Sequence, residues 1–361
     1  MTRTVVFHVV YAMHVGGLER VLINTISRMP QEYEHIVICL TSYSESFASL
    51  LPKNTKVIAL TKKEGQDFSL YLKFFDLLKK YKPQIVHSYN LATLELQVIS
   101  WMLRVPLRIH AEHGRDIYDP TGSNKKYQWL RRLVSPFISV WVSVSEELHC
   151  WLQDTVKIPA KKTKLIRNGI NTKVFQPAAK IEKAFVIGHV GRLSPIKNQK
   201  LLIEAFSIAC NQNNNFANNA KLRIVGEGES RKSLEECIQN SDAKSAIELA
   251  GLHEDMPRVY QNFSVFVMSS LGEGIPMTLL EAMSCGIPPI VTDVGGMPEV
   301  VAREAGIIVP SNNAQAMADA FIQLYNEPGL HEAMMRASLE LIQKKFDEEK
   351  MVSDYISLYR H

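Results

Sequence analysis

Cysteine is scarce in this chain. The 361 residues hold five cysteines, which are scattered and odd in number. No CxxC pair and no Cys/His cluster is present, which excludes a disulfide framework and a structural zinc site. We therefore expect a reducing, cytoplasmic environment.

Long apolar runs are also absent. No stretch of 18 apolar residues occurs, and the run from Val5 to Val15 is interrupted by His8 and His14. Such a run is too short to span a bilayer and lacks the small-residue cleavage site of a signal peptide. The expected location is cytoplasmic, with contact at the inner face of the membrane left open.

The two halves of the chain differ in charge, although the net charge is only +4. Residues 1–175 contain 24 Lys and Arg against 14 Asp and Glu, whereas residues 176–361 contain 17 against 23. Different partners are expected for the two halves. The basic half suits anionic lipid or a phosphorylated acceptor, and the alternative is an ordinary solvated lysine-rich surface.

Strands and helices alternate along the sequence, which is typical of parallel, doubly wound α/β sheets. The length suffices for two domains with sizeable cores, and turn residues cluster after Asn168. The asparagine-rich segment 211–219 is predicted to be an exposed loop. The predicted parts are a first domain at 1–167, a linker at 168–178, a second domain at 179–345 and a helix within 346–361.

The most informative stretch is Ser269–Val300, SSLGEGIPMTLLEAMSCGIPPIVTDVGGMPEV. Glycines flank Glu273, so the backbone can turn tightly there and approach a ligand. A helix is predicted to begin at Pro276, and its N-terminal end carries a partial positive charge that suits a phosphate. The N–H groups expected to be free at this end are those of Met277, Thr278 and Leu279.

Two carboxylates frame this predicted phosphate site. Glu273 lies in the loop, and Glu281 follows eight residues later on the helix. Ionised carboxylates accept hydrogen bonds from sugar hydroxyls, whereas they repel phosphate. Phosphate and hydroxyls together suggest a nucleotide sugar. The alternative, a solvated surface glutamate, is weakened for Glu281 by its apolar neighbours.

Basic and imidazole side chains follow other predicted strands. Arg192 and Lys197 stand in a glycine-led loop after a strand at 185–190, and the planar fork of one and the point charge of the other suit a diphosphate. His113 follows the strand predicted at 108–111, at the sheet edge where ligands of α/β folds bind. The alternatives are exposed basic residues and a structural histidine.

The motif EGIPMTLLE, followed by AMSCGIP, resembles the Glu-x7-Glu signature of retaining glycosyltransferases of family 4, which have the two-domain GT-B fold. The resemblance covers nearly the whole chain. It implies two Rossmann-like domains facing across a cleft, with the last helix packed on the first domain. It also implies similarity to bacterial sugar transferases of exopolysaccharide and lipopolysaccharide synthesis.

The resemblance implies a role for each of these positions. A nucleotide-sugar donor, expected to be a UDP-sugar, would be held by Glu273 at the sugar and Glu281 at the ribose, with Arg192 and Lys197 on the diphosphate. His113 would approach the donor sugar. No metal or cofactor is implied, because the two cations face the phosphates and no Asp-x-Asp is present. The remaining implied donor-binding residues are Gly16, Gly17, Gly226, His253, Gly274, Met277, Thr278 and Leu279.

The acceptor implied by the resemblance is a glycan or a lipid-linked sugar. Residues 125–132 interleave basic and aromatic side chains, which suits peripheral contact with an anionic membrane. The alternative is a helix that packs Leu130 and Leu133 inward beneath a solvated basic face. No nucleic acid partner is expected, because no recognised motif accompanies this composition.

Two other functional classes stay open. A GT-B epimerase would also bind a nucleotide sugar but would need no acceptor. A non-catalytic nucleotide-sugar-binding module would bind the donor without turning it over.

Overall fold

The computed structural model describes residues 3–116, 119, 121–177 and 184–360, which form two compact units. Residues up to Asn168 and those from Glu348 onward form unit 1, and Gly169–Asp347 form unit 2. The segment predicted as a linker belongs to unit 2 from Gly169 to Pro177, and its last residue, 178, lies outside the described residues. A backbone hydrogen bond joins this segment to the residue that follows α14: the Ile170 N–H donates to the Phe346 carbonyl at 2.8 Å.

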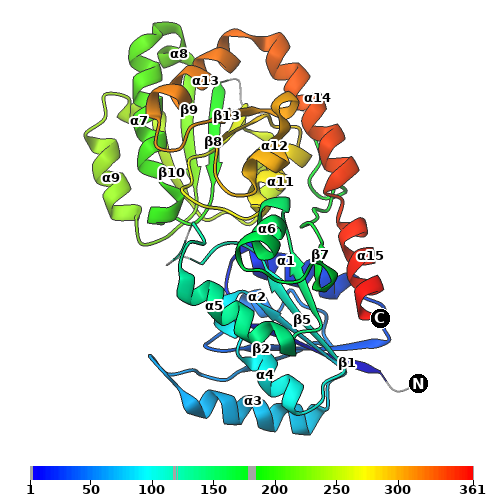
Figure 1. The fold of residues 1–361 in the computed structure, drawn as a ribbon. Coiled ribbons are helices and arrows are strands. Elements are labelled where there is room, and N and C mark those ends of the chain that lie inside the picture. The colour runs from blue at the N-terminus through cyan, green and yellow to red at the C-terminus, as the bar shows by residue number, and fades with distance from the viewer. Residues whose placement is uncertain (1–2, 117–118, 120, 178–183, 361) are drawn as a thin grey trace. The chain divides into compact units, whose positions relative to one another are not determined.

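Unit 1 is built on a seven-stranded parallel sheet in the order β3-β2-β1-β4-β5-β6-β7 (Figure 1). The strands are β1 Thr4–Val10, β2 Tyr33–Cys39, β3 Lys56–Ala59, β4 Ile85–Tyr89, β5 Leu107–Glu112, β6 Val140–Ser143 and β7 Thr163–Leu165. The helices are α1 Gly17–Arg28, α2 Glu45–Ala48, α3 Phe68–Tyr81, α4 Leu96–Met102, α5 Lys125–Val134, α6 Glu146–Cys150 and α15 Glu348–Tyr359. The strands β2 and β3 extend the sheet on one side of β1 and the strands from β4 onward extend it on the other, which is the order of a doubly wound sheet.

Helix α15 returns from the end of unit 2 to pack on unit 1 (Figure 1). Glu348 forms an ion pair with Arg28 of α1. The Tyr359 hydroxyl lies 2.9 Å from Nδ1 of His87, which is buried in β4. The helix is thus anchored both at its first residue and at its last.

Unit 2 is built on a six-stranded parallel sheet in the order β10-β9-β8-β11-β12-β13 (Figure 1). The strands are β8 Phe185–Val190, β9 Ala220–Val225, β10 Ile247–Gly251, β11 Val265–Met268, β12 Pro289–Thr292 and β13 Ile307–Val309. The helices are α7 Gln199–Gln212, α8 Asn214–Asn219, α9 Arg231–Gln239, α10 Met256–Gln261, α11 Met277–Ser284, α12 Met297–Ala305, α13 Ala314–Asn326 and α14 Pro328–Lys345. The expected α/β class and the alternation of strands and helices are confirmed.

The prediction of an exposed loop at 211–219 is wrong. Helix α7 continues to Gln212, and α8 occupies Asn214–Asn219. The Asn213 side chain accepts a hydrogen bond from the Phe216 N–H and so caps α8. Phe216 is fully buried, with its ring 5.7 Å from that of Phe206. One aromatic residue, buried in the core, therefore orders a segment whose composition favours a loop.

No helix among the described residues is both long enough and apolar enough to cross a membrane.

Candidate functional site

The loops after β8 and β11 supply most of the predicted site residues in unit 2. All strands of this sheet are parallel, so the residues that follow them lie along one edge, where α/β folds bind ligands. The Leu271 N–H donates to the Ile196 carbonyl at 2.8 Å, which joins the two loops directly.

Lys197 and Glu273, predicted for different parts of a ligand, are in contact with each other. Lys197 Nζ lies 2.5 Å from Glu273 Oε1, and the Ser270 hydroxyl donates to the same oxygen at 2.7 Å. The Lys197 and Glu273 side chains are 20% and 12% exposed, so solvent screens the pair only partly. Ser269 adds a bond from its hydroxyl to the Lys197 carbonyl at 2.9 Å.

The glycine turn after β12 is shaped by the backbone of Glu273. Gly295 has a φ of 54°, and a Cβ there would lie 1.8 Å from the Glu273 carbonyl oxygen. A Cβ at Gly296 would lie 2.6 Å from the Gly274 carbonyl oxygen. These glycines are therefore needed for packing against the loop that carries Glu273.

Arg192 is exposed at this edge. Its guanidinium makes no ion pair or hydrogen bond with any residue that the structure describes, whereas its backbone carbonyl accepts from the Gln199 side chain at 2.8 Å. Gln199 also lies 3.2 Å from the buried His189, whose pKa is lowered to about 4 by burial. The backbone at Arg192 is thus held while its charge stays available.

Glycines 226 and 228 pack against the loop that carries Arg192. A Cβ at Gly226 would lie 2.0 Å from the Gly191 carbonyl oxygen, and one at Gly228 would lie 2.2 Å from that of Leu193. Close packing against the backbone therefore explains why glycine occupies both positions. His253, predicted near the base, is exposed in the loop that follows β10.

The N-terminal end of α11 is only partly free. The helix begins at Met277, one residue later than predicted, and Pro276 precedes it. The Leu279 N–H donates to the Pro276 carbonyl at 3.2 Å, so its prediction as a free donor is wrong. Within the described residues, the Met277 and Thr278 N–H groups donate no hydrogen bond.

Glu281 is buried on α11 and is held by a tyrosine. The Tyr260 hydroxyl donates to Glu281 Oε2 at 2.6 Å, and Glu281 is 8% exposed. Burial and the nearby Glu281 charge raise the pKa of Tyr260 well above its usual value. Tyr260 therefore remains a hydrogen-bond donor and orients one carboxylate oxygen.

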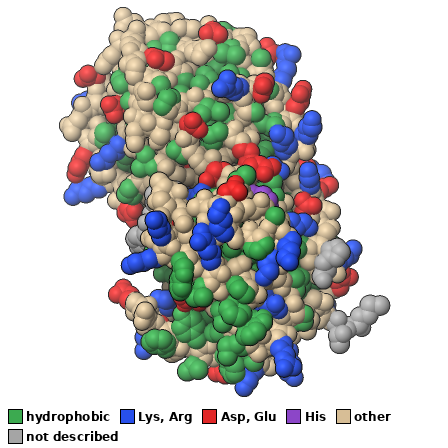
Figure 2. Space-filling view, viewed as in Figure 1, with side chains coloured by type: hydrophobic (Ala, Val, Ile, Leu, Met, Phe, Trp, Pro, Cys, Tyr) green, Lys and Arg blue, Asp and Glu red, His purple; other side chains and the backbone are tan. Residues whose placement is uncertain are grey.

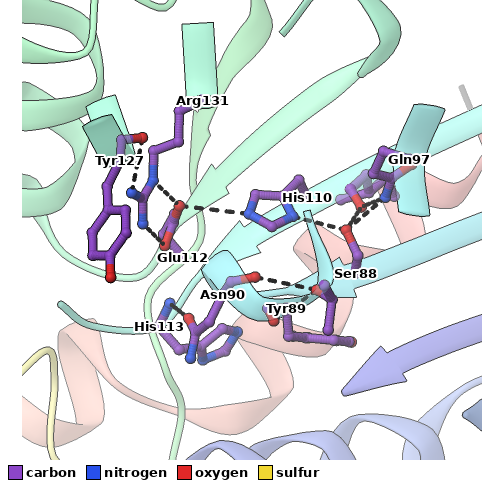
Figure 3. A network of polar contacts seen from close by, with 11 residues as sticks. Ser88, Tyr89, Asn90, Gln97, His110, Glu112, His113, Tyr127 and Arg131 are labelled. Atoms are coloured by element: carbon purple, nitrogen blue, oxygen red, sulfur yellow. Dashed lines mark hydrogen bonds and ion pairs between the residues drawn. The ribbon is translucent and has the colours of Figure 1, made fainter. Parts of the chain in front are cut away.

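The predicted site residues of unit 1 include His113, which follows β5 (Figure 3). Its N–H donates to the Asn90 side-chain oxygen at 2.8 Å. Both ring nitrogens are buried with no hydrogen-bond partner among the described residues. Burial lowers the pKa of His113 to about 3, so the ring is neutral near pH 7 and keeps one N–H donor and one acceptor.

Glu112, the residue before His113, forms a buried ion pair with Arg131 (Figure 3). Glu112 receives two bonds from Arg131, at 2.6 and 3.2 Å, and the two residues are 1% and 3% exposed. Burial alone would raise the pKa of Glu112, but Arg131 and His110 outweigh it and lower the pKa to about 2. His110 in turn lies 2.7 Å from the Ser88 hydroxyl.

This ion pair corrects the prediction of a basic face at 125–132. Arg131 is buried against Glu112, and Arg132, although exposed, donates to the carbonyls of Val156 and Thr155. Leu133, expected in the alternative interpretation to pack inward, is 53% exposed.

The glycine pair near the N-terminus is also shaped by a carboxylate. Gly16 precedes α1, and Gly17 is its first residue rather than part of a loop. A Cβ at Gly16 would lie 2.2 Å from a carboxylate oxygen of Glu19. The side chain of Glu19 thus folds back over the N-terminal end of its own helix, where a negative charge is favourable.

Sequence reasoning missed the residues that hold the predicted ones. Ser270, Tyr260 and Asn90 each bond to a predicted site residue. For Ser270 and Asn90 a signal existed, since each lies within two residues of the C-terminal end of a parallel strand. Tyr260 is distant in sequence from Glu281, and its partner could not be read from spacing.

Two family models match consecutive parts of the chain. The model described as "Glycosyltransferase Family 4" matches residues 15–174, and that described as "Glycosyl transferases group 1" matches residues 171–340.

Relatives and solved structures match over most of the chain. An Escherichia coli protein named UDP-Gal:alpha-D-GlcNAc-diphosphoundecaprenol alpha-1,3-galactosyltransferase is 27% identical, over 98% of this chain and 95% of its own length. The capsular polysaccharide biosynthesis glycosyltransferase CapM of Staphylococcus aureus is 26% identical, over 89% and 86%. The structure of Anabaena HepE in complex with UDP superposes with a TM-score of 0.81 at 19% identity, over 98% of both chains.

The two models together match residues 15–340, both describe the same class of enzyme, and the structural likeness covers both doubly wound units. This chain therefore belongs to glycosyltransferase family 4 and has the GT-B fold.

Proposed function

We propose that this protein transfers a sugar from a nucleotide sugar, in the first instance a UDP-sugar, to a glycan or lipid-linked acceptor in cell-surface polysaccharide synthesis. The observation that carries the proposal is the cluster of Lys197, Glu273 and Ser270, with the exposed Arg192 in the same segment between β8 and α7 as Lys197. Cations suit a diphosphate, and a carboxylate suits sugar hydroxyls. The names of the relatives, which include a UDP-Gal-dependent transferase and a capsule enzyme, support this choice of substrates.

The diphosphate would be met by Arg192 and Lys197. Negative charge grows on the leaving phosphate as the glycosidic bond breaks, so these cations should act more strongly in the transition state than in the ground state. Because they supply positive charge at the phosphates, the proposed reaction needs no metal ion. We propose that configuration is retained, by attack on the face from which the diphosphate leaves, with no covalent enzyme intermediate.

The two glutamates would divide the donor between them. Glu273 lies before α11 and would accept bonds from the sugar, while Glu281, one turn into the helix and oriented by Tyr260, would bind the ribose. In unit 1, neutral His113 would hydrogen-bond the donor sugar, and Gly16 and Gly17 would bind the donor at the N-terminal end of α1.

We further propose peripheral contact between unit 1 and an anionic membrane, through a smaller surface than the sequence suggested. Lys125, Lys126 and the 61% exposed Trp129 remain at the surface of α5. Hydrophobic side chains gather in the lower part of Figure 2, over the region of α3, α4 and α5, with Lys and Arg around them. An aromatic ring beside basic side chains suits the interfacial layer of a bilayer.

The test is a screen of UDP- and GDP-sugars for slow hydrolysis, followed by Arg192→Ala on the sugar that is turned over. Loss of one preorganised donor should lower kcat by about 10²-fold. Lys200→Ala, which removes an exposed cation from the first turn of α7, is the matched control and should keep full activity.

Three results would contradict the proposal. A loss confined to KM would mean that Arg192 binds substrate and transition state equally. Conversion of the donor to an epimer without acceptor would identify an epimerase. Tight donor binding with no hydrolysis and no transfer would identify a binding module.

A further inference from the structure

Asn90 adopts a backbone conformation that side chains rarely accept. It follows β4 directly, with φ 57° and ψ 170°. This region of φ and ψ is essentially reserved for glycine, and other residues persist there only when their surroundings hold them. Strained residues of this kind gather at functional sites. A glycine at this position would relieve the strain, so the presence of an asparagine side chain has to be explained by the contacts that it makes.

The bonds of Asn90 join the loop that follows β4 to β5 and to His113, the residue after β5. Its N–H donates to the Ala111 carbonyl at 2.8 Å, and its carbonyl accepts from the Thr93 N–H at 3.2 Å. Its side-chain oxygen accepts from the His113 N–H at 2.8 Å (Figure 3). The side chain thus makes a contact that glycine could not make.

The imidazole ring of His113 has no polar anchor among the described residues. Neither ring nitrogen has a hydrogen-bond partner among the described residues. The ring lies against Tyr89, with centroids 5.5 Å apart. With no polar anchor on the ring, the position of the imidazole depends on the backbone that Asn90 holds and on packing beside Tyr89.

We propose that Asn90 is a positioning residue: its side-chain oxygen fixes the backbone at His113 and thereby places the imidazole for the donor sugar. The role of His113 in this statement rests on the proposed function. The strain at Asn90 is then the consequence of keeping an acceptor at a turn that would otherwise be glycine.

Asn90→Gly separates this role from a merely structural one, because it relieves the backbone strain and removes only the acceptor. We expect the melting temperature to stay or rise, while kcat falls by about 10-fold or more, since a small misplacement of a reacting group costs up to about 10²-fold. Asn90→Asp keeps the acceptor oxygen and should restore most of the activity. Its added charge should also shift the acid limb of the pH–rate profile upward. Lys82→Gly, at another positive φ outside the site, is the matched control and should leave kcat unchanged.

A second readout needs no turnover. In protein labelled with ¹⁵N-histidine, Asn90→Gly should move the His113 amide resonance and speed its hydrogen exchange, and Asn90→Asp should not speed it. Unchanged exchange and full kcat in Asn90→Gly would overturn the proposal. In a His113→Ala background, Asn90→Gly should cause no further loss of kcat. Full activity of His113→Ala alone would instead overturn the proposed role of His113, while the exchange result would still decide whether Asn90 holds this backbone.

Discussion

Replacing Arg131 by methionine should destabilise unit 1 strongly at neutral pH. The change keeps an unbranched side chain of similar length in α5 but removes the only cation that bonds to Glu112 within the described residues. Glu112 is 1% exposed, so it would remain as a buried carboxylate without its counter-charge.

The magnitude follows from the pKa of Glu112. Its pKa in the folded protein is about 2, against 4.5 for an unperturbed carboxyl, and each pKa unit corresponds to about 1.4 kcal/mol. The ionised form therefore contributes about 3 kcal/mol, present above pH 4.5 and lost as the pH falls through 2. Breaking a buried pair costs about 3–5 kcal/mol, which agrees with this value.

In the variant, the contribution of Glu112 to the unfolding free energy should depend on pH in the opposite direction. Without Arg131, burial is opposed by His110 alone within the described residues, so the pKa of Glu112 should rise and protonation should favour the folded variant as the pH falls. The gap in unfolding free energy between wild type and Arg131→Met should thus narrow between pH 7 and pH 4.

Tryptophan fluorescence during urea unfolding is a suitable assay, because all four tryptophans lie in unit 1, at positions 101, 129, 141 and 151. Glu112→Gln combined with Arg131→Met should cost less than the sum of the single changes. Arg132→Met, which removes bonds to carbonyls only, is the matched control and should cost about 1 kcal/mol. A cost below 1 kcal/mol for Arg131→Met, or strict additivity with Glu112→Gln, would refute the reasoning.

Three further predictions concern the nucleotide, acid stability and the membrane. Glu281→Ala should weaken free UDP by about 1–3 kcal/mol in calorimetry, and Tyr260→Phe by about 1 kcal/mol; unchanged affinity in both would remove Glu281 from the nucleotide site. His35, whose pKa is lowered by burial to about 4, should cost roughly 3 kcal/mol of stability as the pH falls from 6.5 to 4, and His35→Phe should flatten this dependence in urea titrations. Pelleting with anionic vesicles should decrease with salt and decrease further in Lys126→Ser/Trp129→Ser; equal, salt-independent pelleting would refute membrane contact.

The alternation of strands and helices was predictable because it depends on local apolar patterning, which the sequence displays directly. The burial of Arg131 was not predictable. A basic residue beside aromatic residues is expected to be exposed, and its partner Glu112 lies nineteen residues earlier, on another element. Helix α8 is a similar case. Its composition favours a loop, but the Asn213 side chain caps the helix and the ring of Phe216 is buried in the core.

The motif Glu-x7-Glu predicts a role for both glutamates but does not show which residues of the chain contact them. Lys197 and Glu273 come from separate strand-to-helix loops, and their 2.5 Å contact depends on the order of β8 and β11 in the sheet. Asn90 depends in the same way on β4 lying beside β5. The position of a residue in a motif can be read from the sequence, whereas contacts between residues from different strands can be predicted only once the strand order is known.

The contact between Lys197 and Glu273 has a consequence for the proposed reaction. The two charges neutralise one another, so an anion such as inorganic phosphate would have to displace a carboxylate to reach the lysine. Under the proposed function, a complete donor would compensate both residues, because its diphosphate would pair with the lysine and its sugar hydroxyls would donate to the glutamate. A nucleoside diphosphate without its sugar would compensate the lysine alone and leave Glu273 to compete for it. On this proposal, Glu273 would favour the complete donor over the free nucleotide.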